Sequence, residues 1–155
     1  MKILGIDPGA NAGWALFDGP HGSESSHALA RCGVLRPPYV LPEGLAGVDV
    51  LVIEKPHPGD ARASKADLIK LASRMGQLIG LVRARETVEV LPGGIPKAIR
   101  NKRTIERLTF RERAAVDRAE GLKKGSKAVH NTLDAIWHVL EYCKAHGMRG
   151  APGAL

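Results

Sequence analysis

The sequence is poor in aromatic residues, in cysteines and in long apolar runs. Aromatic side chains make up 4% of its 155 residues, so any hydrophobic core must be mainly aliphatic. Cys32 and Cys143 form no CxxC pair, which excludes a cysteine zinc site or a disulfide framework and indicates reduced thiols in a cytoplasmic protein. No apolar run reaches the roughly 18 residues of a membrane-spanning helix. The short apolar opening MKILGIDPG is not expected to be a signal peptide.

Positive charge is concentrated in one segment. The net charge is +7 at pH 7, and residues 91–130 hold 11 Lys or Arg against four Asp or Glu, which accounts for the whole imbalance. A one-signed segment is typical of a surface that contacts the phosphates of a nucleic acid, although a solvated helix face is the alternative. Its first five basic residues are the candidates for DNA contact: Lys97, Arg100, Lys102, Arg103 and Arg107.

Hydrophobic patterning predicts an α/β fold with a mixed sheet. The expected strands are residues 2–7, 13–17, 27–35, 48–53 and 87–91. The expected helices are residues 64–85, 103–120 and 128–146. Gly76 and Gly80 share one face of the first helix and would allow the close approach of a sheet or a second helix. The length favours a single domain over residues 1–155, with a flexible tail at about 148–155.

Three acidic residues stand at unusual places. Asp7 ends the first expected strand, Glu54 follows the 48–53 strand, and Asp134 lies on the apolar side of the last helix. Carboxylates that meet in a fold raise one another's pKa unless a cation neutralises them. Mg²⁺ prefers carboxylate oxygens with water and substrate phosphate, and two such ions can assist the cleavage of a phosphodiester. Taken singly, each acid is also compatible with an ordinary turn, ion pair or helix position.

Three segments resemble the RuvC-type Holliday-junction resolvases, nucleases with a ribonuclease-H-like fold. ILGIDPGANAGWAL, which contains Asp7, resembles the family's opening motif, and VLVIEKP, which contains Glu54, resembles its second acidic motif. HNTLDAIWHVLEY, which contains Asp134, resembles its C-terminal motif. The resemblance covers nearly the whole chain and is that of a divergent member of the phage type. It implies a ribonuclease-H-like fold, with a five-stranded mixed β-sheet flanked by α-helices.

The resemblance also implies a metal centre. Asp7, Glu54 and Asp134 would hold two Mg²⁺ or Mn²⁺ ions per active site. The family usually has Asp or His three residues before the last acid, where this sequence has Asn131, which offers a carbonyl oxygen but no charge. His130, four residues before Asp134, is the alternative ligand, and the choice between the two stays open.

Two lysines of the family contact DNA near the cut. In this sequence Lys97, and Lys102 or Arg103, lie in the matching region, with a shorter gap between them.

The leading hypothesis is a metal-dependent endonuclease that resolves four-way DNA junctions by paired symmetric nicks in recombination, repair or phage DNA processing. Two symmetric nicks suit a homodimer, and helix 64–85 is its candidate surface, with core packing as the other role of its apolar stripe. One alternative is an RNA-processing nuclease of the same fold, of the ribosomal RNA maturation type. Another is a catalytically silent DNA-architectural protein, with Asn131 as a sign of decay.

Overall fold

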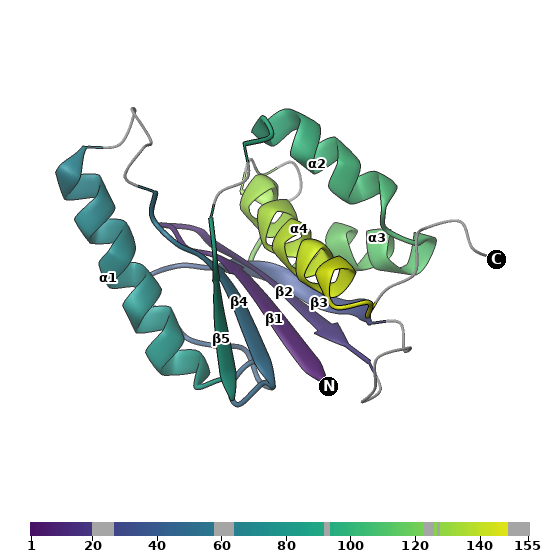
Figure 1. Cartoon of the computed structure of the whole chain (residues 1–155), viewed down its shortest axis with the longest axis horizontal. Helices are drawn as coiled ribbons and strands as arrows, with labels where there is room; N and C mark the ends of the chain where they lie inside the picture. The colour runs from purple at the N-terminus through teal and green to yellow at the C-terminus, as the bar shows by residue number, and fades with distance from the viewer. Residues whose placement is uncertain (20–26, 58–63, 92–93, 123–125, 127, 149–155) are drawn as a thin grey trace.

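Five strands and four helices make up the described part of the chain. A computed structural model describes residues 1–19, 27–57, 64–91, 94–122, 126 and 128–148 (Figure 1). The strands are β1 (Lys2–Asp7), β2 (Ala12–Asp18), β3 (Ala28–Leu35), β4 (Val50–Glu54) and β5 (Glu86–Val90). The helices are α1 (Lys65–Val82), α2 (Lys97–Glu106), α3 (Phe110–Asp117) and α4 (Val129–Ala145). Except for residue 148, the tail that the sequence predicts to be flexible lies outside the described residues.

The strands form one mixed sheet in the order β3-β2-β1-β4-β5. The β1–β2 and β2–β3 pairs are antiparallel, whereas β1–β4 and β4–β5 are parallel. Helix α1 covers one face of the sheet, and α2, α3 and α4 lie on the other (Figure 1). The predicted α/β fold, with a five-stranded mixed sheet flanked by helices, is confirmed.

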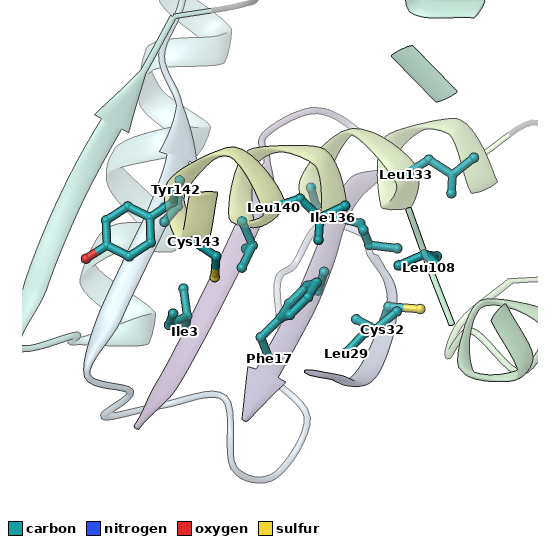
Figure 2. Packing of buried hydrophobic residues seen from close by; sticks show 14 of the residues in the cluster. Ile3, Phe17, Leu29, Cys32, Leu108, Leu133, Ile136, Leu140, Tyr142 and Cys143 are labelled. Atoms are coloured by element: carbon teal, nitrogen blue, oxygen red, sulfur yellow. The ribbon is translucent and has the colours of Figure 1, made fainter. Parts of the chain in front are cut away.

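The alternation of side chains along the strands divides the core into two layers. On β1, Ile3 packs toward α4, while Leu4 and Ile6 pack toward α1. Figure 2 shows the layer under α4, which is aliphatic apart from a few aromatic side chains such as Phe17. Met75, Leu78 and Val82 of α1 fill the opposite layer, so this half of the apolar stripe belongs to the core.

Two glycines let α4 lie directly on the sheet. A Cβ atom at Gly5 would lie 2.4 Å from the carbonyl oxygen of Ala135, and one at Gly13 would lie 2.1 Å from that of Asn131. Both distances are too short for any side chain. The first turns of α4 are therefore seated against β1 and β2 at a separation that only glycine permits.

The outer edge of β3 is covered by the residues after α3. The Glu120 amide donates to the carbonyl of Cys32 (2.9 Å), and the Val34 amide donates to the carbonyl of Glu120 (2.8 Å). Arg31 adds an ion pair with the Glu120 carboxylate, with Nε 2.8 Å from Oε1. This short parallel bridge ties the end of α3 to the sheet.

One sequence expectation was wrong. The segment expected as one helix over 103–120 forms α2 and α3, because Thr109 caps a new helix and exchanges hydrogen bonds with Glu112 in a capping box. The close approach that Gly76 and Gly80 would allow is not made within the described chain, where nothing lies within 4 Å of a Cβ placed at either position. No described helix has the length and apolar character needed to cross a membrane.

The glycine contact yields a test. Gly13→Ala forces a methyl group into the backbone of α4, and we expect a loss of about 3 kcal/mol in the free energy of unfolding. The melting temperature of a chain of this size should fall by roughly 6–12 °C. Gly80→Ala is the matched control, because its helical position opens onto free space and it should stabilise by about 0.5–1 kcal/mol. Equal melting temperatures for the two variants would contradict the close contact.

Candidate active site

The strand period places two acids toward α4. Successive residues of a strand point to opposite faces, so Asp7 shares the face of Ile3 and Gly5 on β1. On β4, Glu54 shares the face of Val50 and Val52. Because β1 and β4 are parallel neighbours, both carboxylates lie at the carboxyl ends of adjacent strands, beneath α4.

Asp7, Glu54 and Asp134 form one electrostatic cluster. The pKa of Asp7 is raised from 3.8 to about 8, first by burial and then by the charges of Glu54 and Asp134, against an opposing effect of Lys97 and Arg100. A carboxyl group with so high a pKa is poorly neutralised by its protein surroundings. The charges of Glu54 and Asp134 therefore act on Asp7 within one region of the fold.

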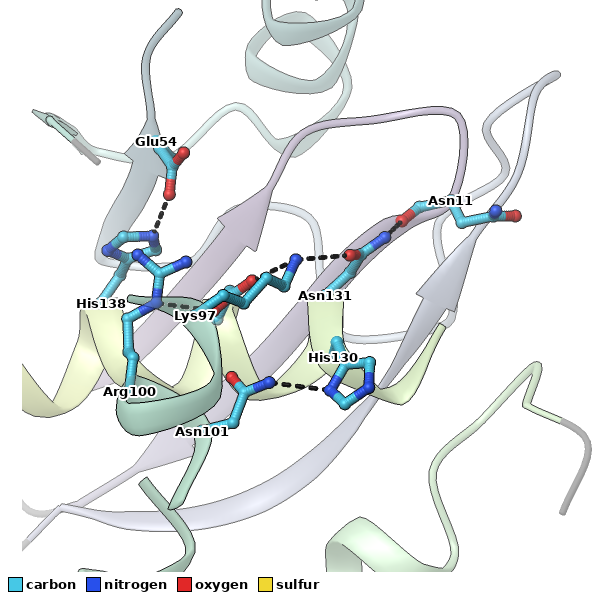
Figure 3. A network of polar contacts seen from close by, with 9 residues as sticks. Asn11, Glu54, Lys97, Arg100, Asn101, His130, Asn131 and His138 are labelled. Atoms are coloured by element: carbon cyan, nitrogen blue, oxygen red, sulfur yellow. Dashed lines mark hydrogen bonds and ion pairs between the residues drawn. The ribbon is translucent and has the colours of Figure 1, made fainter. Parts of the chain in front are cut away.

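Asp134 is buried and fully paired. Lys97 Nζ lies 2.6 Å from its Oδ2 atom, and Arg100 Nε lies 2.8 Å from its Oδ1 atom (Figure 3). Arg100, expected to contact DNA, is itself buried and directs its guanidinium to this carboxylate. Lys97 differs, because 48% of its side chain is exposed, so its amino group lies at the border between the acids and solvent.

His138 is a site residue that the sequence reasoning missed. Its Nε2 atom lies 2.7 Å from Oε2 of Glu54, and its ring is buried (Figure 3). It stands four residues after Asp134, so both side chains lie on the same face of α4. That spacing was the available signal. The contact fixes the orientation of the Glu54 carboxylate.

Asn131 and His130 point to different neighbours. Asn131 Oδ1 accepts from Lys97 Nζ (3.2 Å), and its Nδ2 donates to the carbonyl of Asn11 (2.6 Å). The His130 Nδ1 atom lies 2.8 Å from Nδ2 of Asn101 on α2 (Figure 3). The structure therefore brings Asn131 to the lysine that pairs with Asp134, and turns His130 toward α2.

The remaining basic candidates lie farther along α2. Lys102 and Arg103 are exposed, and Lys102 makes a loose ion pair with Glu106 at 3.9 Å. Arg107 is bonded to Glu141 and stacks over the ring of Trp137 at 5.3 Å. Lys102 and Arg103 are thus available to an external anion, whereas Arg107 is engaged with α4.

The oxygen donors of the three acids suit a hard divalent cation, provided that Lys97 releases the Asp134 carboxylate. Among the described residues, no three His, Cys, Asp or Glu side chains converge as a ready-made ligand set. Mg²⁺, however, commonly uses one or two carboxylates and completes its shell with water and phosphate. Asp7 and Glu54 supply such carboxylates, and the high pKa of Asp7 is the expected mark of a site that lacks positive charge. Asp134 can join them only where Lys97 gives up its oxygen.

Comparisons with known proteins place the fold. No protein-family model and no curated protein matches the chain. The Holliday junction resolvase of fowlpox virus matches with a TM-score of 0.55 and 14% identity, over 94% of this chain and 99% of that one. RuvC of Thermus thermophilus aligns with a TM-score of 0.46 and 11% identity, over 94% of this chain and 98% of that one. The same protein in complex with a Holliday junction substrate aligns with a TM-score of 0.46 and 17% identity, over 97% and 99%.

The resemblance to resolvases is thus confirmed as a likeness of structure over nearly the whole chain at low sequence identity. The fowlpox virus match shows a shared fold. The chemistry of the site stands on the residues described above.

The pKa of Asp7 predicts how stability depends on pH. Its folded value of about 8 lies above the ordinary 3.8, so the folded protein keeps a proton that the unfolded chain loses between these values. The free energy of unfolding should therefore fall between about pH 4 and pH 8, by at most about 1.4 kcal/mol per pH unit, and level off above. Asp7→Asn removes this dependence, so its melting temperature in a chelator should exceed that of the wild type by a margin that grows over this range.

Asp18→Asn is the control, because Asp18 is exposed at the end of β2. Its melting temperature should follow the wild type at every pH. A pH-independent difference between Asp7→Asn and the wild type would contradict the unneutralised carboxyl group.

The pairing of Asp134 predicts an unusual effect of Lys97. Lys97→Met removes a cation that competes for the carboxylate, so it should tighten Mg²⁺ binding several-fold in the absence of DNA. Isothermal titration calorimetry at pH 8.5 measures this directly. Lys102→Met is the matched control, since this lysine is 80% exposed on the same helix and pairs only with Glu106 among the described residues. Unchanged or weaker Mg²⁺ binding in Lys97→Met would argue against the competition.

Proposed function

We propose that the chain is a metal-dependent endonuclease that resolves four-way DNA junctions. The observation that carries the proposal is the electrostatic effect of Glu54 and Asp134 on Asp7 at one end of a ribonuclease-H-like sheet, where the pKa of Asp7 is raised to about 8. Carboxylates held together at this cost are a common arrangement for binding cations at a catalytic site. The four-way junction as substrate is supported by the motifs and by the fold shared with the fowlpox virus Holliday junction resolvase.

Asp7 and Glu54 would hold the first of two Mg²⁺ or Mn²⁺ ions, and Asp134, with Asn131 as a neutral oxygen donor, would help to hold the second. The ions supply positive charge that stabilises the attacking and leaving oxygens of the phosphodiester. His138 keeps Glu54 oriented, and buried Arg100 keeps Asp134 in place. His130 bonds to Asn101 and is the weaker candidate for a ligand.

Basic residues next to the three acids would bind the phosphates of DNA. Lys97 is partly exposed and lies within reach of a phosphate that approaches the acids. Lys102 and Arg103 extend the positive surface along α2, where they would hold a DNA arm. A phosphate that draws Lys97 away from Asp134 would at the same time free this carboxylate for a cation.

Two copies of the chain would make the paired nicks. A homodimer relates two active sites by a two-fold axis, which matches the symmetry of the junction. Helix α1 offers the surface, because Ile69 and Leu81 are exposed on it at 61% and 41%. Met75, Leu78 and Val82 of the same helix pack on the sheet, so the core face and the exposed apolar residues lie on different sides of α1.

A cleavage assay tests the function. The protein should cut a labelled four-way junction in Mg²⁺ or Mn²⁺ at symmetric positions, and should leave a matched linear duplex and a structured RNA intact. Asp7→Asn and Glu54→Gln should each lower the single-turnover rate by about 100-fold or more while junction binding persists. Glu89→Gln, an exposed acid on β5, is the control and should cut like the wild type. Metal-independent cutting, or full activity of Asp7→Asn, contradicts the proposal.

A further inference from the structure

Phe110 is an aromatic side chain that the fold leaves in solvent. Its side chain is 89% exposed, whereas Phe17, the other phenylalanine, is fully buried. Exposing a phenylalanine forfeits the free energy that burial of its ring would provide. Phe110 adds nothing comparable to the core, and its ring is open to contact by a partner outside the chain.

The backbone that carries Phe110 is fixed. Phe110 is the first residue of α3 and directly follows Thr109, whose hydroxyl and amide both bond to Glu112. Glu112 is buried, and its other oxygen accepts from the amide of Leu29 on β3. The aromatic ring therefore projects from a rigid corner, which lowers the entropic cost of binding a flat ligand.

The corner is also positively charged. Arg111 follows Phe110 and is exposed, and Arg103 is exposed on the preceding helix. Within the described chain, neither guanidinium forms an ion pair with an acidic side chain. Ile105, 42% exposed, adds apolar surface at the end of α2. A flat apolar side chain followed in the sequence by Arg111, with Arg103 exposed on the preceding helix, is complementary to a base whose phosphates carry the opposite charge.

We propose that Phe110 stacks on an unpaired base of a DNA strand whose phosphates are bound by Arg103 and Arg111. Paired bases inside a duplex offer no free face to such a ring, so the ligand is single-stranded DNA or an unpaired base where a duplex opens. The corner lies at the opposite end of α2 from Lys97. A helix of 10 residues spans about 15 Å, so this site holds DNA away from the acids.

The inference deepens the proposed function and depends on it only for the choice of DNA. The stacking site requires DNA binding, not cleavage, so the two proposals can fail separately. If the junction is not cut but a single strand stacks on Phe110, only the nuclease assignment falls. If the junction is cut and Phe110→Ala binds a single strand like the wild type, only the stacking site falls.

Fluorescence anisotropy of the full chain tests the inference, with a fluorescein-labelled 20-nucleotide single strand and its duplex in a chelator. Phe110→Ala should weaken single-strand binding by about fivefold or more, as expected for the loss of one stacked base, and change duplex binding by less than twofold. Phe110→Trp should retain single-strand affinity, and the exposed indole should be quenched by the single strand but not by the duplex. Arg111→Ala should weaken both and reduce the salt dependence.

Val40→Ala is the matched control, because Val40 is 75% exposed and lies outside the helices. It should bind both DNA forms like the wild type. Equal losses on single strand and duplex in Phe110→Ala, at an unchanged melting temperature, would overturn stacking in favour of general surface contact. An unquenched Phe110→Trp indole would overturn it as well.

Discussion

The seating of α4 on β1 and β2 is the contact on which the rest of the site depends. Gly5 and Gly13 bring the helix backbone so close that the carbonyl groups of Ala135 and Asn131 occupy the space of a side chain. Asp134 lies between these two residues in the sequence of α4, so the close packing also holds Asp134 near β1, the strand that ends in Asp7. A longer helix-to-sheet distance would leave the carboxylates in separate, hydrated environments and would remove the cause of the raised pKa.

The same contact explains why two basic residues of α2, Lys97 and Arg100, pair with Asp134. An acid forced into a buried position needs charge compensation, and the sheet supplies none on this face. Arg100 enters from α2 as a buried partner with a directional bond, whereas Lys97 stays partly exposed. The Lys97 side chain can therefore move more easily than the Arg100 side chain. Arg100 is part of the structure of the site, and Lys97 can exchange one anion for another at little cost in packing.

The sequence predicted the elements that follow a regular period and the acids at their ends. Each strand had its own apolar run, and Asp7 and Glu54 were recognisable because a carboxylate follows a buried strand. The orientation of α2 was not accessible, because a helix rich in Lys and Arg does not reveal which face turns inward, and Arg100 was therefore grouped with the DNA contacts. His138 was overlooked since its partner, Glu54, stands 84 residues away. The spacing of Thr109 and Glu112 is that of a capping box and predicts the start of α3. The many charged residues of this segment hide the end of α2, because they show no clear apolar period.

The two edges of the sheet restrict how copies of this chain can associate. On β3 the Cys32 carbonyl and the Val34 amide bond to Glu120, so this part of the edge is not free to pair with another strand. On β5 the outer edge carries exposed Glu86 and Glu89, and like charges face one another when such a strand pairs with its own copy. Continuation of the sheet from one molecule into the next is disfavoured at both ends. Both features disfavour edge-to-edge aggregation and favour self-association through side-chain surfaces.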